Sequence, residues 1–189
     1  MNLPNRLTIL RLILTVPFVA ALSLPFPGAK LLALGLFIVS SVTDYADGYI
    51  ARKYKLITDF GKLMDPLVDK IMTVSAFICL VSLGSVPAWA VIVIVSREFL
   101  ITGLRLIATV RGKVLPAERL GKIKTLLQIV TILYCLIVIA IVDQFGDLHP
   151  LTVSSLNWVG LTLVLLTVGL TVWSGISYFA KNWDLVSDF

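Results

Sequence analysis

Long apolar segments are the feature that most limits how this chain can fold. Six of them lie along 189 residues, each close to the ~20 residues that a helix needs to cross a bilayer. They span residues 7–24, 30–50, 66–83, 86–108, 123–142 and 151–179. Only 14% of the residues are charged, too few to cover the surface of a soluble helical core of this length. The chain is therefore predicted to be an integral membrane protein.

Short runs rich in helix-breaking residues separate several of these segments, at 25–28, 84–87 and 146–150. Such short connections predict that neighbouring helices run antiparallel. Lipid offers no water to the backbone, so spanning segments must be helices or closed barrels. We expect an all-α integral membrane bundle of six transmembrane helices, forming a single domain over residues 1–189.

Basic residues gather in the two connections that would lie at one end of this bundle. They are Arg52, Lys53, Lys55, Lys62, Arg111, Lys113, Arg119 and Lys122. The opposite connections carry Lys30 and almost nothing else basic, whereas Arg6 precedes the first segment and Lys181 follows the last. Basic loops stay on the cytoplasmic side of a membrane. Both termini and both basic connections are therefore predicted to be cytoplasmic.

Four aspartates lie at the predicted cytoplasmic ends of the second and third segments. Asp44 and Asp47 are three residues apart, and Asp65 and Asp69 are four apart, so each pair shares one face of a helix. The hairpin between the segments can bring the pairs together. Converging carboxylates repel one another unless cations neutralise them. Oxygen ligands suit Mg²⁺ or Mn²⁺, so the spacing predicts a site for two such ions.

Single aspartates also have structural interpretations. Asp65 precedes Pro66, which is typical of a helix N-cap followed by a first-turn proline. Asp44 or Asp69 could form a buried ion pair with Arg52 or Lys70. These alternatives stay open for each residue alone, but they do not readily explain all four residues at this spacing.

The aspartates belong to a pattern of eight residues within 26 positions. Its members are Asp44, Asp47, Gly48, Ala51, Arg52, Gly61, Asp65 and Asp69. This pattern resembles the signature of the CDP-alcohol phosphatidyltransferase family. The resemblance implies a six-helix membrane fold, an active site that faces the cytoplasm, and divalent metal.

The resemblance also implies roles for these residues. The principal metal ligands would be Asp44, Asp47 and Asp65. Asp69, near or on the metals, would be the base that deprotonates the acceptor hydroxyl, in a direct attack without a covalent enzyme intermediate. The CDP pocket would be formed by Asp47, Gly48, Ala51, Arg52 and Gly61.

A second group of charges lies in the fourth and fifth segments, at Arg97, Arg105, Lys122 and Lys124. Arg97 is ~16 Å along its predicted helix, which is deep for an unpaired charge, so we expect it to face a cavity or the bundle interior. If both segments line one cavity, the four side chains form a pocket for an acceptor that carries a phosphate. Alternatively, Arg97 pairs with an acid, Arg105 snorkels, and the lysines anchor the helix at the interface.

Several further runs resemble the bacterial members of the family that make phosphatidylglycerophosphate. They are Asn2-Leu3-Pro4-Asn5, Phe60-Gly61-Lys62, Arg97-Glu98-Phe99, Gly121-Lys122 with Lys124, Thr125 and Gln128, and Trp173-Ser174-Gly175-Ile176 with Tyr178. The resemblance implies transfer of the phosphatidyl group of CDP-diacylglycerol to sn-glycerol 3-phosphate, with release of CMP. It also implies the bacterial cytoplasmic membrane as location.

Two other functions stay open at this point. Another member of the same family, such as a cardiolipin or phosphatidylserine synthase, would share the aspartate pattern. An ion transporter also binds cations with intramembrane acids, but its acids are expected near the bilayer midplane on broken helices. The resemblance further suggests a homodimer, for which Gly160, Gly169 and Gly175 could serve a helix interface.

Overall fold

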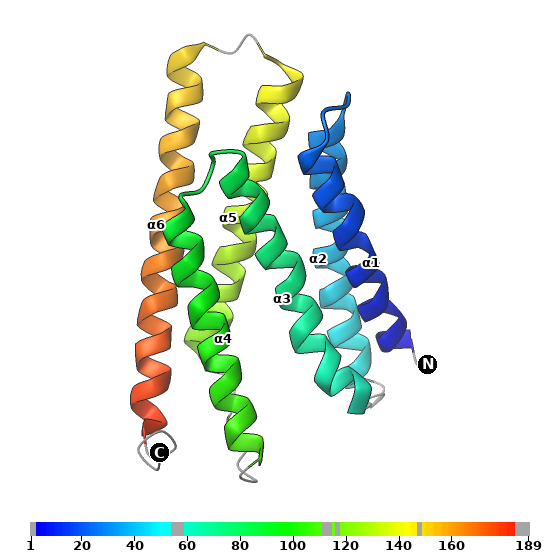
Figure 1. Ribbon diagram of the computed structural model, residues 1–189, viewed down its shortest axis with the longest axis vertical. Helices are drawn as coiled ribbons and strands as arrows, with labels where there is room; N and C mark the ends of the chain where they lie inside the picture. The colour runs from blue at the N-terminus through cyan, green and yellow to red at the C-terminus, as the bar shows by residue number, and fades with distance from the viewer. Residues whose placement is uncertain (1–2, 54–58, 111–114, 116–117, 147–148, 184–189) are drawn as a thin grey trace.

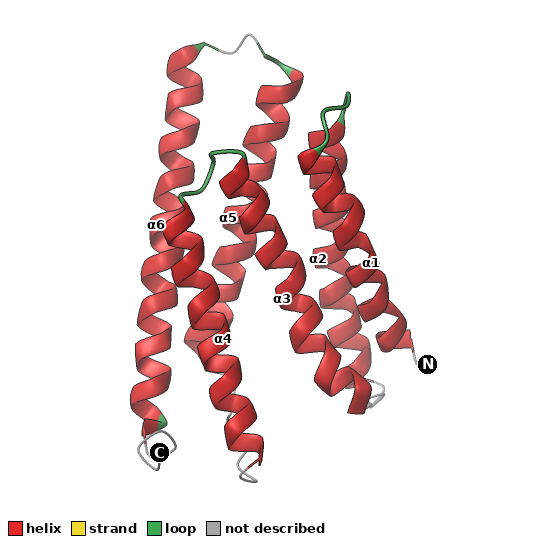
Figure 2. Ribbon diagram, viewed as in Figure 1, coloured by secondary structure: helices red, strands yellow, loops and turns green. Residues whose placement is uncertain are grey.

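The computed structural model is helical throughout the part of the chain that it describes. This part comprises residues 3–53, 59–110, 115, 118–146 and 149–183, without the side chains of residues 3–6, 45–53, 59–66, 69 and 110. Figure 2 shows helices and loops there and no strand. The six helices are α1 (Leu3–Ser23), α2 (Ala29–Lys53), α3 (Asp59–Ser82), α4 (Ala88–Val110), α5 (Arg119–Gln144) and α6 (Pro150–Lys181).

Each helix covers all or nearly all of one of the six apolar segments, and several helices continue into the polar residues beside it. The helices are between 21 and 32 residues long, which corresponds to ~30 Å or more at 1.5 Å per residue. The largest extension is at α3, which begins at Asp59. Asp65 therefore lies inside this helix, and the N-cap interpretation of Asp65 and Pro66 is wrong.

Successive helices alternate in direction, as the short connections predict (Figure 1). α1 packs against α2 and α3, α6 packs against α4 and α5, and α2 and α3 also contact α5. One end of the bundle carries the end of α2, the start of α3 and the start of α5. We call it the charged end, because the predicted site residues lie toward it. The start of α1 and the end of α6 also lie there.

Two glycine turns close the opposite end of the bundle. Gly28, before α2, has a φ angle of 76°, and Gly84, after α3, has 72°. Residues with a side chain rarely adopt this left-handed conformation, so glycine suits both turns. At the end of α3, the backbone N–H of Gly84 donates to the carbonyl of Val81 and that of Ser85 donates to Leu80, both at 2.9 Å. These bonds satisfy carbonyls that the helix end leaves unpaired.

Apolar side chains occupy both the core and much of the outer surface. The core contains large buried residues such as Phe18, Phe37, Phe77 and Leu136. Exposed large apolar residues occur on every helix, among them Val16, Val42, Ile78, Ile92, Leu126 and Trp173. Extensive exposure of large apolar side chains is typical of proteins that contact a membrane or a partner. The surface is therefore that of a membrane protein.

By length and composition, α5 and α6 are apolar enough to cross a membrane, with hydropathies of 2.7 and 2.0. No other helix passes this test within the described residues. In α4 the apolar stretch is interrupted by Arg97, Glu98 and Arg105. The charges that weaken the apolar pattern of α4 are thus residues of the candidate site.

Two of the three glycines considered for an interface between copies pack inside the chain. A Cβ atom on Gly160 would lie 3.4 Å from the Tyr134 ring, and one on Gly175 would lie 3.1 Å from Cγ of Arg97. Gly169 has open space, with nothing within 4 Å of a Cβ. Gly160 and Gly175 therefore serve contacts within the bundle.

Candidate active site

The four aspartates lie toward the charged end, Asp44 and Asp47 in α2 and Asp65 and Asp69 in α3. The short connection between these helices places the end of α2 and the start of α3 at the same end of the bundle (Figure 1). The side chains of Asp47, Asp65 and Asp69 fall outside the described residues. The described side chains form no metal-ligating group of three or more, and they include only Asp44 of the four predicted ligands.

Asp44 forms an ion pair with Arg11 of α1. The Arg11 side chain is 3% exposed, whereas the Asp44 side chain is 46% exposed, so the pair spans from the bundle interior to an open surface. One turn beyond Arg11, Thr15 links α1 to α3, because its hydroxyl donates to the Arg11 carbonyl at 3.0 Å within α1 and also lies 3.5 Å from Sδ of Met72 in α3. An arginine inside an apolar segment signals such a partner. The spacing of residues in the sequence does not identify Asp44 as that partner.

The predicted CDP-binding residues are divided between the same two helices. Asp47, Gly48, Ala51 and Arg52 belong to the end of α2, and Gly61 belongs to the start of α3. The surroundings of all five lie outside the described residues. Their role in binding CDP stays a prediction.

A cavity of ≈ 610 Å³ lies among α3, α4, α5 and the end of α6. This volume is typical of a site for a small molecule. Five basic side chains line it, against two acidic ones. They are Lys70, Arg97, Arg105, Lys122 and Lys124, with Glu98 and Glu118. The structure thus places all four predicted acceptor-binding residues around one space.

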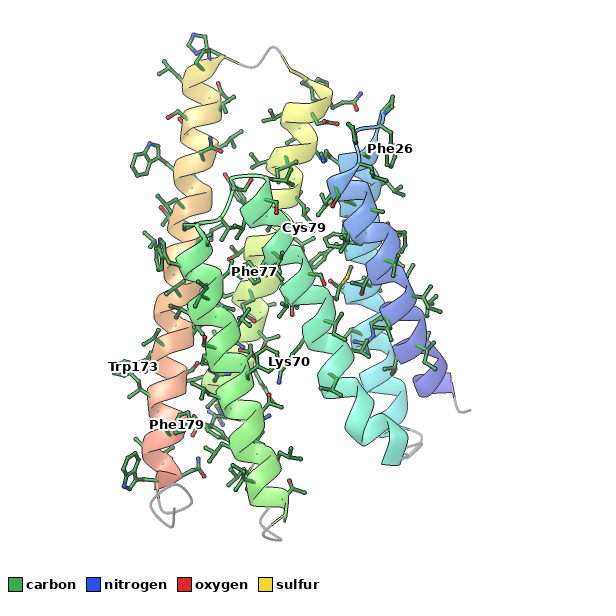
Figure 3. The ribbon with its side chains drawn as sticks, viewed as in Figure 1. Phe26, Lys70, Phe77, Cys79, Trp173 and Phe179 are labelled. Atoms are coloured by element: carbon green, nitrogen blue, oxygen red, sulfur yellow. The ribbon has the colours of Figure 1, made fainter. Side chains whose placement is uncertain are left out.

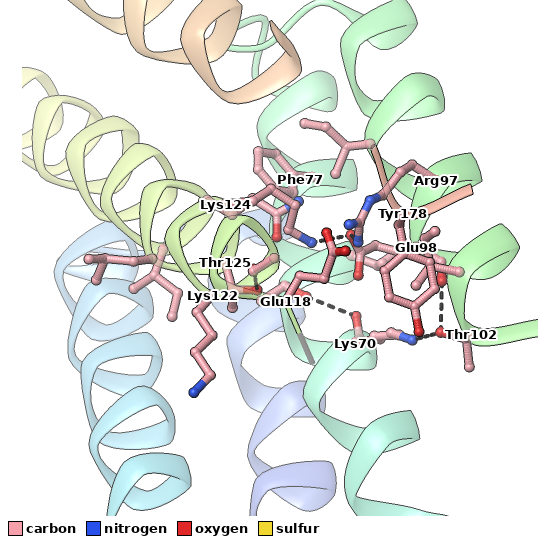
Figure 4. Close-up of a pocket in the computed structure, with 18 of the residues that line it drawn as sticks. Lys70, Phe77, Arg97, Glu98, Thr102, Glu118, Lys122, Lys124, Thr125 and Tyr178 are labelled. Carbon is pink, nitrogen blue, oxygen red and sulfur yellow. Dashed lines mark hydrogen bonds and ion pairs between the residues drawn. The ribbon is translucent and has the colours of Figure 1, made fainter. Parts of the chain in front are cut away.

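Glu98 is the central acid of this cavity, and Figure 4 shows Lys124 directed toward it. Lys124 is only 2% exposed and pairs with Oε1 of Glu98. The same oxygen accepts from Nη1 of Arg97 at 3.3 Å. Arg97 thus pairs with an acid, as the alternative interpretation expected, but the buried Lys124 is not a surface anchor. The pairing of one carboxylate with two cations leaves an excess of positive charge.

The other two predicted residues lie nearer to solvent. Lys122 is exposed, and its side chain points away from the group around Glu98 (Figure 4). Arg105 is exposed in part, and its Nε donates to the Tyr178 hydroxyl at 3.1 Å. Lys124 and Gln128 are buried while Lys122 and Thr125 are exposed, which agrees with the helical faces expected for α5.

Lys70, Gln128 and Tyr178 also line the cavity and were not predicted as site residues. Lys70 follows Asp69 directly in the sequence, lies between α3 and α4 (Figure 3), and donates to the Thr102 hydroxyl. The cavity is therefore adjacent, along α3, to the predicted base. The sequence did offer a sign of this role, because Lys70 is a charged residue near the start of an apolar segment. In α6, the run Trp173-Ser174-Gly175-Ile176 with Tyr178 was part of the resemblance, but its contribution to the cavity depends on contacts between helices.

A basic cavity of this size can hold a small anionic molecule, with arginine and lysine donors for a phosphate group. Glu98 keeps two of these cations in place. Lys70 and Thr73 line the α3 wall of the cavity, and they follow Asp65 and Asp69 closely along that helix. The arrangement is suited to binding a phosphorylated compound close to the predicted reactive aspartates at the charged end.

Comparison with known proteins points the same way. The sequence model of the CDP-alcohol phosphatidyltransferase family matches residues 1–173. A Bacillus subtilis protein named CDP-diacylglycerol–glycerol-3-phosphate 3-phosphatidyltransferase is 42% identical, over 97% of this chain and 96% of its own length. A protein of that name from Rickettsia bellii is 36% identical, over 94% of this chain and 93% of its own. A Mycobacterium tuberculosis protein named probable phosphatidylglycerophosphate synthase is 36% identical, over 95% of this chain and 81% of its own length. The chain belongs to the CDP-alcohol phosphatidyltransferase family of transferases.

Proposed function

We propose that this chain transfers the phosphatidyl group of CDP-diacylglycerol to sn-glycerol 3-phosphate, giving phosphatidylglycerophosphate and CMP. The observation that carries this choice of acceptor is the cavity lined by five basic side chains. A neutral acceptor such as inositol, or a zwitterion such as serine, does not require so many cations. The names of the relatives from Bacillus subtilis and Rickettsia bellii support the same reaction.

Members of the family generally depend on divalent metal ions. In this chain Asp44, Asp47, Asp65 and Asp69 would hold one or two ions, Mg²⁺ or Mn²⁺, since a set of carboxylate oxygens suits these hard cations. Bound there, the ions neutralise the charge of the diphosphate and of the departing CMP. Arg11 orients Asp44 for this role through their ion pair.

The remaining chemistry belongs to side chains of the protein. Asp69 takes the proton from the 1-hydroxyl of glycerol 3-phosphate. The hydroxyl oxygen then attacks the phosphorus attached to diacylglycerol, and the bond to CMP breaks. Asp47, Gly48, Ala51, Arg52 and Gly61 form the pocket for the CDP group. The acceptor phosphate is bound by Arg97, Arg105, Lys122 and Lys124.

The six helices cross the membrane as one domain of residues 1–189, with both termini in the cytoplasm. The exposed apolar residues on every helix support six spans. The basic residues of the charged end support its cytoplasmic location. In a bacterium the protein would lie in the cytoplasmic membrane, as a homodimer, with CDP-diacylglycerol entering from the lipid.

The acceptor is tested with purified protein in lipid nanodiscs that contain CDP-diacylglycerol. CMP release is measured in the presence of Mg²⁺ or Mn²⁺ with one acceptor at a time. The acceptors are glycerol 3-phosphate, inositol, serine and phosphatidylglycerol. We expect release with glycerol 3-phosphate, its loss on chelation, and its recovery when metal is restored. Release with another acceptor of this panel and none with glycerol 3-phosphate would refute the proposal and indicate a different member of the family.

A further inference from the structure

Helix α6 contributes to the cavity although none of the predicted site residues lies on it. Its buried face contains Thr167, Thr171, Ser174, Gly175 and Tyr178, at the spacing of three and four residues that defines one side of a helix. The last three of these lie beside the two arginines of α4. Each makes a contact that constrains an arginine side chain.

Arg97 is held between α6 and its own helix. Its Nη2 donates to Oγ of Ser174 at 3.1 Å, while Nη1 donates to Glu98 at 3.3 Å. The stem of the side chain runs over Gly175, where a Cβ atom would be 3.1 Å from Cγ and 3.7 Å from Nε of Arg97. A methyl group at position 175 would therefore require the stem of this arginine to shift by a few tenths of an ångström.

Arg105 is held by Tyr178, one helical turn beyond Ser174. Its Nε donates to the Tyr178 hydroxyl at 3.1 Å, and its guanidinium carbon lies 5.3 Å from the centre of the ring. This bond uses Nε and not the two terminal amino groups, which are the donors that a phosphate engages in pairs. Tyr178 itself is 2% exposed, so its own position is fixed by packing.

We infer that α6 is the positioning element of the acceptor site, where Ser174, Gly175 and Tyr178 set the orientation of Arg97 and Arg105 before the acceptor binds. The inference rests on the proposed function. Arginine side chains are long, and ordering them in advance removes a cost that binding would otherwise carry. In this role, none of the three α6 residues takes part in proton transfer or binds the acceptor phosphate itself. They act on the acceptor only through the two guanidinium groups.

A purely structural role of these contacts makes a different prediction. If they only join α4 to α6, their loss changes the stability of the protein and leaves the KM for glycerol 3-phosphate unaffected. If they position the arginines, that KM rises while the KM for CDP-diacylglycerol stays the same. The test therefore compares the two KM values of each variant, together with its thermal stability in detergent.

The first variant is Tyr178→Phe, which retains the ring and removes the hydroxyl. We expect the KM for glycerol 3-phosphate to rise about tenfold or more, as for the loss of one hydrogen bond to a charged group. Tyr134→Phe is the matched control, because it removes a tyrosine hydroxyl that donates to the Leu156 carbonyl at 2.9 Å, outside the cavity. An unchanged acceptor KM in Tyr178→Phe would overturn the inference.

The second variant is Gly175→Ala, with Gly169→Ala as its control, since a Cβ at position 169 meets open space. We expect only the former to raise the acceptor KM. If Gly175→Ala does not fold, Tyr178→Phe carries the test together with Ser174→Ala. An acceptor KM that rises equally in both glycine variants would show that α6 acts through general packing.

A double variant tests whether Tyr178 acts through Arg105. In an Arg105→Ala background, Tyr178→Phe should have no further effect on the acceptor KM, because the group that it positions is gone. Effects that multiply independently would contradict positioning. The acceptor panel on the unchanged protein comes first: failure with glycerol 3-phosphate there refutes the proposed function, whereas activity with unaltered KM values in the α6 variants refutes only this inference.

Discussion

At the scale of single residues, Asp69 is the group on which the proposed proton transfer depends. Asp69→Asn keeps the shape of the side chain and removes the base. We expect CMP release to fall by at least about 100-fold, while binding of CDP-diacylglycerol is largely retained. Asp143→Asn is the control, because Asp143 lies beside the turn between α1 and α2, away from the charged end. Activity retained in Asp69→Asn would remove this residue as the base.

Gln128 provides a second prediction at this scale. It is 4% exposed, lines the cavity one turn beyond Lys124, and its amide nitrogen has no hydrogen-bond partner among the described residues. A buried donor without a partner costs about 1–3 kcal/mol, and an oxygen of a phosphorylated acceptor would satisfy it. Gln128→Met removes the donor at similar length. We expect the KM for glycerol 3-phosphate to rise about fivefold or more, without loss of thermal stability.

Thr131→Val is the control for Gln128→Met and should behave in the opposite way. Thr131 is buried on the same helix, shares a hydrogen bond of 2.8 Å with Thr167 of α6, and does not line the cavity. Its replacement leaves the Thr167 hydroxyl without this partner, so stability should fall by about 1–3 kcal/mol with the acceptor KM unchanged. A Gln128→Met variant that loses stability at constant KM would mean that the amide is structural.

At the scale of elements, Glu98 joins α4 to α5. Glu98→Gln leaves the buried ammonium of Lys124 without its carboxylate. Removing one partner of a buried ion pair costs about 3–5 kcal/mol. We therefore expect a marked decrease in the midpoint of thermal unfolding, measured for the detergent-solubilised protein.

Two further variants show whether this loss comes from the unpaired charge. Glu118→Gln removes the acid from an ion pair with Lys181, which is 64% exposed, and exposed pairs contribute about 1 kcal/mol or less. Lys124→Met combined with Glu98→Gln removes both buried charges and should recover part of the lost stability. If the double variant is no more stable than Glu98→Gln alone, the buried ammonium is not the cause.

The sequence predicted the elements well but not their ends or their contacts. The bilayer imposes a minimum length on an apolar helix, so each segment corresponds to one helix. The polar start of α3 escaped prediction, because hydropathy does not report a helix that continues from Asp59 into polar residues. Arg97 and Lys124 were expected near one cavity because intramembrane charges need partners. Ser174 and Tyr178 were noticed only as part of a resemblance, because their contacts with Arg97 and Arg105 depend on the packing of α6 against α4 and not on spacing along one helix.

At the scale of the whole molecule, the charged end and the glycine turns lie at opposite ends of the bundle (Figure 1). If the six helices cross the membrane, these ends face different compartments. The two natural cysteines, Cys79 and Cys135, are free and buried. A Cys79→Ala, Cys135→Ala background is therefore a suitable start for labelling of introduced single cysteines.

The proposed orientation can be measured with Phe26→Cys, Gly146→Cys and Trp183→Cys in that background. Phe26 lies in the turn between α1 and α2 (Figure 3), Gly146 lies between α5 and α6, and Trp183 follows α6 at the charged end. In intact cells, a membrane-impermeant maleimide should label the first two, and Trp183→Cys should react only after the membrane is permeabilised. The reverse pattern would overturn the cytoplasmic location of the charged end. Equal labelling of Gly146→Cys and Trp183→Cys in intact cells would show that α6 does not cross the membrane.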